Sequence, residues 1–298
     1  MKAKELIDRY NKGFRDFSDI NLSREDLNGA GLVAIDLANA NLSETNLSRA
    51  TLNEANLYSV NLKTSVLYRA SLSDANLCEA DLNGASLIKA DLHGARLERA
   101  CLRDVDLTGA NLNAVSLVNA DLTGANLSCV SLVGANLEGA NLSEAFLKGA
   151  NLDGAKLNGA NLEGTNLSGA SFSEANLSHA NLKSANLCHA NLYAANLSDA
   201  LLSKADLSGA NLSNANLSDA DLNDADLNGA FLVDAHLGRV HLSGANLSKT
   251  NCYKTDFGGA FLLGTNFNGA NLNCTNFANA SLQSVDYDNL PDAEYALD

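Results

Sequence analysis

The sequence predicts an all-β solenoid, and three observations lead to this fold class. Leucine, or less often an aromatic residue, stands at every fifth position from Phe17 to Tyr287 except at Cys252, and no residue is inserted or lost between these positions. A period of five fits neither the 3.6 residues of a helical turn nor the 2.0 of a strand, so the chain must turn a corner every five residues. Tryptophan is absent and proline occurs once, which suits thin, regular stacking better than a bulky core. Such a chain buries its apolar side chains by stacking successive coils.

Every pentapeptide has the same pattern around its central residue, here called position i. Position i is leucine in 48 of 55 repeats, position i−2 is usually alanine, and position i−1 is usually asparagine or aspartate. Positions i+1 and i+2 are mostly serine, glycine, asparagine or charged residues. We therefore expect i and i−2 to point inward, and we expect the amides at i−1 to form stacked ladders on the outside.

The number of pentapeptides in one coil follows from a ten-residue alternation near the C-terminus. The central residues there alternate between aromatic and aliphatic, as in Phe257, Leu262 and Phe267. Aromatic central residues stack on aromatic ones, and aliphatic on aliphatic, only if a coil holds an even number of pentapeptides. Two would enclose no core and six would leave a hole that leucine cannot fill, so we predict four, or 20 residues per coil. At a coil spacing of about 4.8 Å, about 14 coils would form a rod on the order of 65 Å long.

The two ends of the repeat region interrupt this pattern. Residues 1–15 predict a short capping helix over residues 3–14, because the apolar residues there share one helical stripe; a membrane-surface helix is the alternative. The stripe consists of Ala3, Leu6, Ile7, Tyr10 and Phe14. The repeats are predicted over residues 16–288. After them, Leu290, Pro291 and Asp292 break the repeat, so residues 289–298 are predicted to be a C-terminal cap or tail, in which Tyr295 and Leu297 could cover the last coil.

The composition limits the possible partners and location. The formal net charge of −15 disfavours nonspecific binding to nucleic acid or to an anionic membrane. No apolar run is long enough for a secretory signal or a membrane span, so we expect a cytoplasmic protein, with a thylakoid-associated location left open. Five of the six cysteines fall at outward positions and none forms a CxxC pair, which predicts free thiols.

The sequence gives no indication of catalysis. His236 and His241 occupy successive i−1 positions, and Cys188 adjoins His189, but neither pair supplies the three or four ligands of a metal site. Active sites usually lie on loops that project from a scaffold, and this chain has no insertion that could form one. We predict a protein that is not an enzyme and that has no metal or other cofactor.

Repeats of the form A-[N/D]-L-x-x, such as Ala110-Asn111-Leu112 and Ala220-Asp221-Leu222, resemble those of the pentapeptide-repeat family over most of the chain. The resemblance implies a right-handed quadrilateral parallel β-helix with four pentapeptides per coil, and right-handedness agrees with the general hand of parallel crossovers. The segment RDFSDINLS after the opening helix resembles cyanobacterial members, one of which modulates heterocyst differentiation. Gyrase-binding members pair through their C-terminal ends, so the chain is expected to be a monomer or such a dimer.

Two functions are consistent with these features. In the first, the chain is a scaffold or regulator that binds an unidentified protein, with no direct nucleic-acid or membrane binding. In the second, the acidic rod mimics DNA and binds gyrase or another topoisomerase. A 65 Å rod would need about 38 negative charges to match duplex DNA. This chain has 35 acidic and 20 basic residues and lacks projecting loops, so mimicry is the alternative.

Two outward patches are candidate interaction sites. Arg49, Arg69 and Lys89 are 20 residues apart at position i+2, so they should stack in one column beside Tyr68, where an acidic segment of a partner could bind; a merely solvated face is the alternative. The second patch consists of Tyr193, Phe231, Val233 and Tyr253. Exposed aromatics on adjacent coils can mark an interface, but single apolar residues on a surface are also common.

Overall fold

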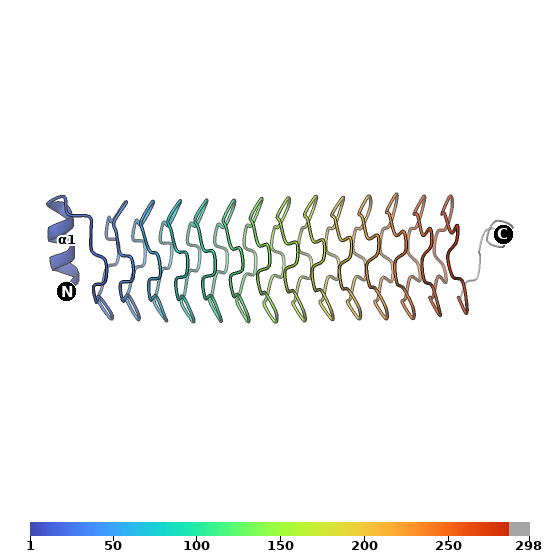
Figure 1. The fold of residues 1–298 in the computed structure, drawn as a ribbon, viewed down its shortest axis with the longest axis horizontal. Helices are drawn as coiled ribbons and strands as arrows, with labels where there is room; N and C mark the ends of the chain where they lie inside the picture. Colours follow the sequence, from blue (N-terminus) through green and yellow to red (C-terminus); the bar gives the residue numbers. More distant parts are fainter. Residues whose placement is uncertain (286–298) are drawn as a thin grey trace. The chain divides into compact units, whose positions relative to one another are not determined.

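The structure, a computed structural model, describes residues 1–285. The chain divides into two units, Met1–Asn151 and Leu152–Asp298, which are described separately. Unit 1 begins with a helix, α1 (Ala3–Asn11), and continues as stacked coils; unit 2 consists of coils as far as residue 285 (Figure 1). The C-terminal cap or tail predicted for residues 289–298, with Tyr295 and Leu297, lies outside the described residues, and so do the last central residue, Tyr287, and a C-terminal dimer contact.

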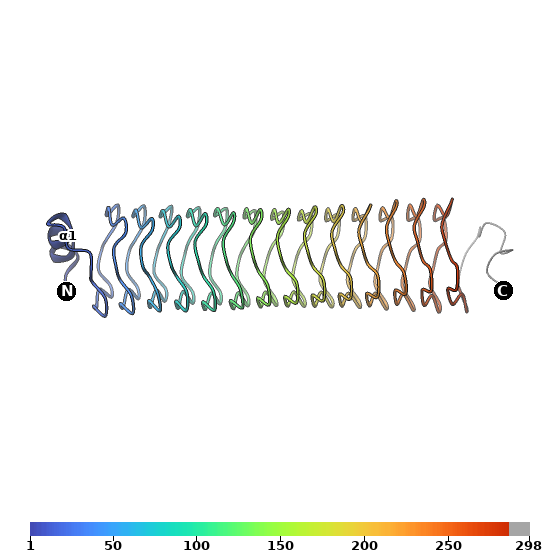
Figure 2. The same ribbon diagram turned by 45° about the horizontal axis from the view of Figure 1, so that its top comes forward.

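Parallel bridges join the coils within each unit. In unit 1 they connect Asn46 with Val66 and Val66 with Ser86, and in unit 2 they connect Asn211 with Phe231. Every such bridge joins residues 20 positions apart, so four pentapeptides complete one coil and the predicted coil size is confirmed. Figure 2 shows the successive coils of each unit, blue to green in unit 1 and green to red in unit 2.

In a pentapeptide such as residues 46–50, all five backbone amides have acceptors, which explains the preference for asparagine and aspartate at i−1. The side-chain oxygen at i−1 accepts the amide of residue i+1, and the other amides donate to carbonyls of the same or adjacent coils. A buried amide without an acceptor is costly, so this arrangement allows the coils to repeat. In residues 46–50 the acceptors are, in order, Glu25 O, Val66 O, Asn46 Oδ1, Tyr68 O and Leu47 O.

The amide side chains also form the predicted ladders between coils. Asn61 Nδ2 donates to Asn41 Oδ1 at 3.2 Å, and Asn211 Nδ2 donates to Asn191 Oδ1 at 3.1 Å. The side chains at i−1 therefore form hydrogen bonds between adjacent coils as well as within each pentapeptide.

The interior consists of the predicted leucine and alanine positions, which are almost fully buried. Phe257 and Phe277, 20 residues apart, stack with ring centres 5.3 Å apart. Buried threonines at i−2 donate their hydroxyls to the backbone, as Thr255 does to Leu232 O at 2.7 Å. The ten-residue alternation therefore reflects like residues stacked on like.

Helix α1 covers the first coil but is shorter than predicted. Leu6 is fully buried, Ala3 N donates to Glu25 Oε2 at 2.9 Å, and the hydroxyl of Tyr10 donates to Val33 O at 2.8 Å. The helix ends at Asn11, and Phe14, predicted to lie on its buried stripe, follows the helix and is 52% exposed. Gly13, with a φ of +95°, redirects the backbone between them.

Candidate functional site

Arg49, Arg69 and Lys89, here called the basic column, lie on three successive coils of unit 1. Their amides donate to Tyr68 O, Ile88 O and Thr108 O, and all three side chains are exposed. Each residue has a φ between 56° and 58°, the left-handed conformation that recurs at position i+2. The turn projects these long side chains outward, so the stacking expected from their 20-residue spacing is present.

Within residues 1–285, no carboxylate lies within ion-pair distance of the basic column, and this absence sets its two arginines apart from the other arginines of the coils. Near the N-terminus, Arg9 lies over the rings of Phe14 and Phe17, and Arg15 lies over the ring of Tyr10. The remaining arginines pair with carboxylates: Arg24 with Glu44, Arg96 with Glu98, Arg99 with Glu79, Arg103 with Asp121 and Arg239 with Asp219. Within residues 1–285, Arg49 and Arg69 are thus the arginines of the coils without an acidic partner.

Apolar groups flank the basic column. The guanidinium of Arg69 lies 5.3 Å from the centre of the Tyr68 ring, and Val66 is 42% exposed. Ile88, beside Lys89, is half-buried. Cationic and apolar side chains are therefore presented together on one outer surface.

The second predicted patch lies in unit 2, and its members are in register. A chain of parallel bridges from Asn191 through Asn211 and Phe231 to Asn251 places Tyr193, Val233 and Tyr253 in one column, with Phe231 beside it. Phe231 is 50% exposed. On a different set of pentapeptides, His241 and Phe261 stack with ring centres 4.6 Å apart, a pair that the sequence pattern did not single out.

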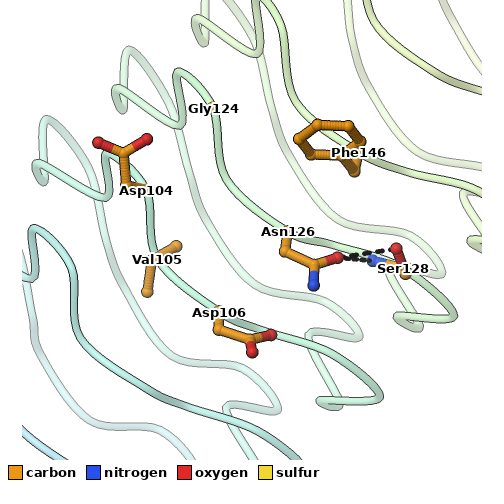
Figure 3. Close-up of a pocket in the computed structure, with 7 residues that line it drawn as sticks. All are labelled: Asp104, Val105, Asp106, Gly124, Asn126, Ser128 and Phe146. Atoms are coloured by element: carbon orange, nitrogen blue, oxygen red, sulfur yellow. Dashed lines mark hydrogen bonds between the residues drawn. The ribbon is translucent and has the colours of Figure 1, made fainter.

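A shallow hollow in unit 1, also missed from the sequence, has a volume of about 430 Å³. Figure 3 shows Phe146 and Asp104 on either side of it, with Asn126 and Asp106 between them. Ser128 also lines it, but its hydroxyl donates to Asn126 Oδ1 at 2.7 Å, and no histidine or lysine lines the hollow. No exposed loop marks this place in the sequence, since Gly124 and Phe146 only change side-chain size within the unbroken repeat.

The cysteines and histidines form no metal-binding group among residues 1–285, where no cluster of three or more potential ligands occurs. All six thiols are free, as predicted. Cys78 occupies an outward repeat position but is buried, because Glu98 of the next coil covers it, with Sγ and Oε2 2.6 Å apart, and leaves it 6% exposed. Burial and this hydrogen bond raise the pKa of the Cys78 thiol, and burial raises that of Cys252 to about 11.

The coil pattern agrees with a known family. The family model described as "Pentapeptide repeats (8 copies)" matches the chain in overlapping segments between residues 32 and 286. This chain belongs to the pentapeptide repeat family. The three-residue motif at i−2, i−1 and i, by which the sequence resembled this family, is the part that forms the core and the amide ladders.

Several proteins of solved structure are similar to this chain. HetL from the cyanobacterium Nostoc, a pentapeptide repeat protein involved in heterocyst differentiation regulation, is 30% identical over 96% of each chain, with a TM-score of 0.27. A pentapeptide repeat protein of the Arabidopsis thaliana thylakoid lumen is 34% identical over 36% of this chain and 67% of its own, with a TM-score of 0.27. QnrB1, a plasmid-mediated fluoroquinolone resistance protein, is 15% identical over 92% of this chain and 90% of its own, with a TM-score of 0.30.

None of the curated proteins matches the chain. Among residues 1–285, α1 is too short to cross a membrane, and no helix there combines the necessary length and apolar character.

Proposed function

We propose that this pentapeptide repeat protein is a non-enzymatic interaction scaffold or regulator, and that the basic column is its contact surface for an acidic segment of a protein partner. The observation that carries the proposal is that no carboxylate among residues 1–285 lies beside Arg49 and Arg69, whereas the other arginines of the coils are paired. A net charge of −15 makes such a cationic surface electrostatically distinct.

The composition of the column suits protein recognition. Arginine and tyrosine are enriched among residues that dominate binding energy, and arginine can bind a carboxylate through two parallel hydrogen bonds. Arg69 is already oriented by the Tyr68 ring, and Val66 adds apolar surface that a partner could bury. Less side-chain entropy is lost on binding when the side chain is oriented in advance.

Affinity capture from the native host, with quantitative mass spectrometry, tests this proposal. The test variant carries Arg49→Glu, Arg69→Glu and Lys89→Glu. The matched control carries Lys156→Glu, Lys204→Glu and Lys249→Glu, which change the net charge equally at exposed sites of unit 2. We expect the test variant to lose at least one partner that the control keeps. If both variants retain every partner of the wild type, the basic column is not the contact surface.

DNA mimicry is the second candidate, and the net charge of −15 favours it. Several carboxylates are already paired with arginine, including Glu79, Asp121 and Asp219, and this pairing reduces the free negative surface. A supercoiling assay with purified gyrase distinguishes the two candidates. Inhibition or protection at submicromolar concentration would support mimicry, and no effect at high micromolar concentration would exclude it.

We also propose the remaining features inferred from the sequence. The 20-residue register within each unit supports a right-handed quadrilateral β-helix, about 14 coils in all, because parallel crossovers are generally right-handed. A cytoplasmic location, and the absence of a cofactor, of nucleic-acid binding and of membrane binding, stay predictions.

A further inference from the structure

The basic column has a complementary segment within the same sequence. Residues 286–298, which follow the described part of unit 2, contain five acidic residues and no lysine or arginine. The acidic residues are Asp286, Asp288, Asp292, Glu294 and Asp298. Tyr287, Leu290, Tyr295 and Leu297 lie among them, so this acidic segment combines negative charge with apolar side chains.

Both components of the acidic segment match the column. The column offers three exposed cations, none with a carboxylate within ion-pair distance in residues 1–285, beside the partly exposed Val66 and Tyr68. Carboxylates on the coils are poorer candidates, because many already serve the fold: Asp106 Oδ1 accepts the amide of Thr108 at 3.0 Å, for example. Complementary charge would select the acidic segment, and apolar burial would strengthen the contact.

The length of the acidic segment is sufficient. Successive coils are about 4.8 Å apart, so the backbone positions of Arg49 and Lys89 are separated by about 10 Å. An extended segment covers about 3.4 Å per residue, so four residues span this separation and 13 leave ample slack. Asp288, Asp292 and Glu294 could therefore reach all three cations from one segment.

We propose that residues 286–298 of one copy bind the basic column of a second copy. This inference rests on the proposed function of the column as a contact surface and names its partner. The two contact surfaces differ, so the association is heterologous, and a dimer keeps a free column on one copy and a free acidic segment on the other. Assembly can then continue beyond a dimer as the concentration rises.

Analytical ultracentrifugation of the full-length chain tests this proposal at about 0.15 M and about 1 M salt, where the screening lengths are about 8 Å and about 3 Å. We expect weak association, with a dissociation constant on the order of 100 µM, because exposed ion pairs contribute little each. The average mass should rise with concentration at the lower salt. At the higher salt, the association constant should fall at least about tenfold.

Two variants and their controls locate the contact. The column variant carries Arg49→Glu, Arg69→Glu and Lys89→Glu; the segment variant carries Asp→Asn or Glu→Gln at the five acidic positions of residues 286–298. Each should be monomeric alone. The column control replaces three exposed lysines of unit 2 by glutamate: Lys156, Lys204 and Lys249. The segment control carries the same Asp→Asn or Glu→Gln changes at five exposed positions: Asp19, Glu144, Glu174, Asp224 and Asp234. Both controls should associate like the wild type.

Mixing the column variant with the segment variant provides the decisive result. The mixture has one intact segment and one intact column, so it should form dimers that do not grow further. A wild-type chain that stays monomeric up to millimolar concentration would overturn the proposal. A chain whose acidic segment binds its own column would also stay monomeric, so that case counts against the proposal as well. The proposal would also be overturned if the segment variant associated as strongly as the wild type. That result would leave the proposed function intact, because the column could still bind another protein. The proposed function fails under a different result, namely that the column variant retains every partner of the wild type in affinity capture.

Discussion

The guanidinium of Arg69 lies 5.3 Å from the centre of the Tyr68 ring, and no carboxylate within residues 1–285 lies within ion-pair distance of it. Arg99, by contrast, bonds Glu79 of the preceding coil, and the Tyr58 hydroxyl donates to the same carboxylate at 2.7 Å. Both arginines occupy position i+2. Their difference arises from the residues 20 positions away, which decide whether a cation has a partner.

Charge reversal of the basic column should leave folding almost unchanged. Arg49→Glu, Arg69→Glu and Lys89→Glu break no ion pair within the part of the chain that the structure describes, and glutamate already occupies the same left-handed position at Glu54 and Glu79. We expect a change in unfolding free energy within about 1 kcal/mol, measured by urea denaturation. A larger loss would mean that the column stabilises the coils and is not a free contact surface.

The left-handed turn predicts opposite effects for two stacked residues, Ala114 and Gly134. Ala114 has a φ of 56° and Gly134 a φ of 65°, and a Cβ added at Gly134 would have no heavy atom within 4 Å. Backbone conformation alone should therefore decide the result. Gly134→Ala should destabilise and Ala114→Gly should stabilise, each by about 1 kcal/mol.

Urea denaturation of the two single variants measures these effects. Gly31→Ala serves as a control, because Gly31 lies outside the positive-φ glycines and also has open space around its Cβ position. Equal effects of Gly134→Ala and Gly31→Ala would contradict the assignment of the cost to the turn.

The thiols should react with alkylating reagents in the order of their exposure. Only the thiolate reacts, and burial raises the pKa of Cys252 to about 11, so at pH 8 about one thousandth of that thiol is ionised. Cys78 has a raised pKa because of burial and its hydrogen bond to Glu98. Raising the pH increases the ionised fraction, but burial still excludes the reagent.

Mass spectrometry after timed iodoacetamide labelling follows each site. Cys101, Cys129 and Cys274, which are exposed, should label first. Cys78 and Cys252 should label at comparable rates only after denaturation. Rapid labelling of Cys78 in the native chain, with Cys252 protected, would show that Glu98 does not cover it.

Loss of the α1 contact should loosen the first coil and leave distant coils intact. Leu6 is fully buried, and its truncation to alanine should cost about 2–5 kcal/mol locally. Hydrogen exchange should therefore accelerate at the amides of Phe17 and Leu22, because stability in a repeat protein depends on neighbouring units. Lys4→Ala, an exposed change on the same helix, is the control and should have no such effect. Equal acceleration in the coils of unit 2 would contradict this local picture.

Much of the fold could be predicted from the sequence, because each pentapeptide has the same pattern of apolar and polar positions. Leucine at i and alanine at i−2 specify the interior, and the alternation of Phe257, Leu262 and Phe267 specifies four repeats per coil. The stacking of Arg49, Arg69 and Lys89 followed from that register. The end of α1 at Asn11 was missed, because the apolar stripe continues through Phe14; the signal that marked the end was Gly13, whose φ of +95° takes the chain out of the helix.

The sequence by itself determined the family, the coil length and the inward and outward positions, since a strict period of five permits one way to bury its leucines. The tertiary structure decided which outward side chains meet. Glu98 buries Cys78, Glu79 binds Arg99, and Arg69 lies on Tyr68 with no acidic partner among the described residues. The first two contacts join residues 20 positions apart and the third joins neighbours in sequence. All three depend on side-chain length and direction, which the five-residue period does not specify, because it determines only the backbone.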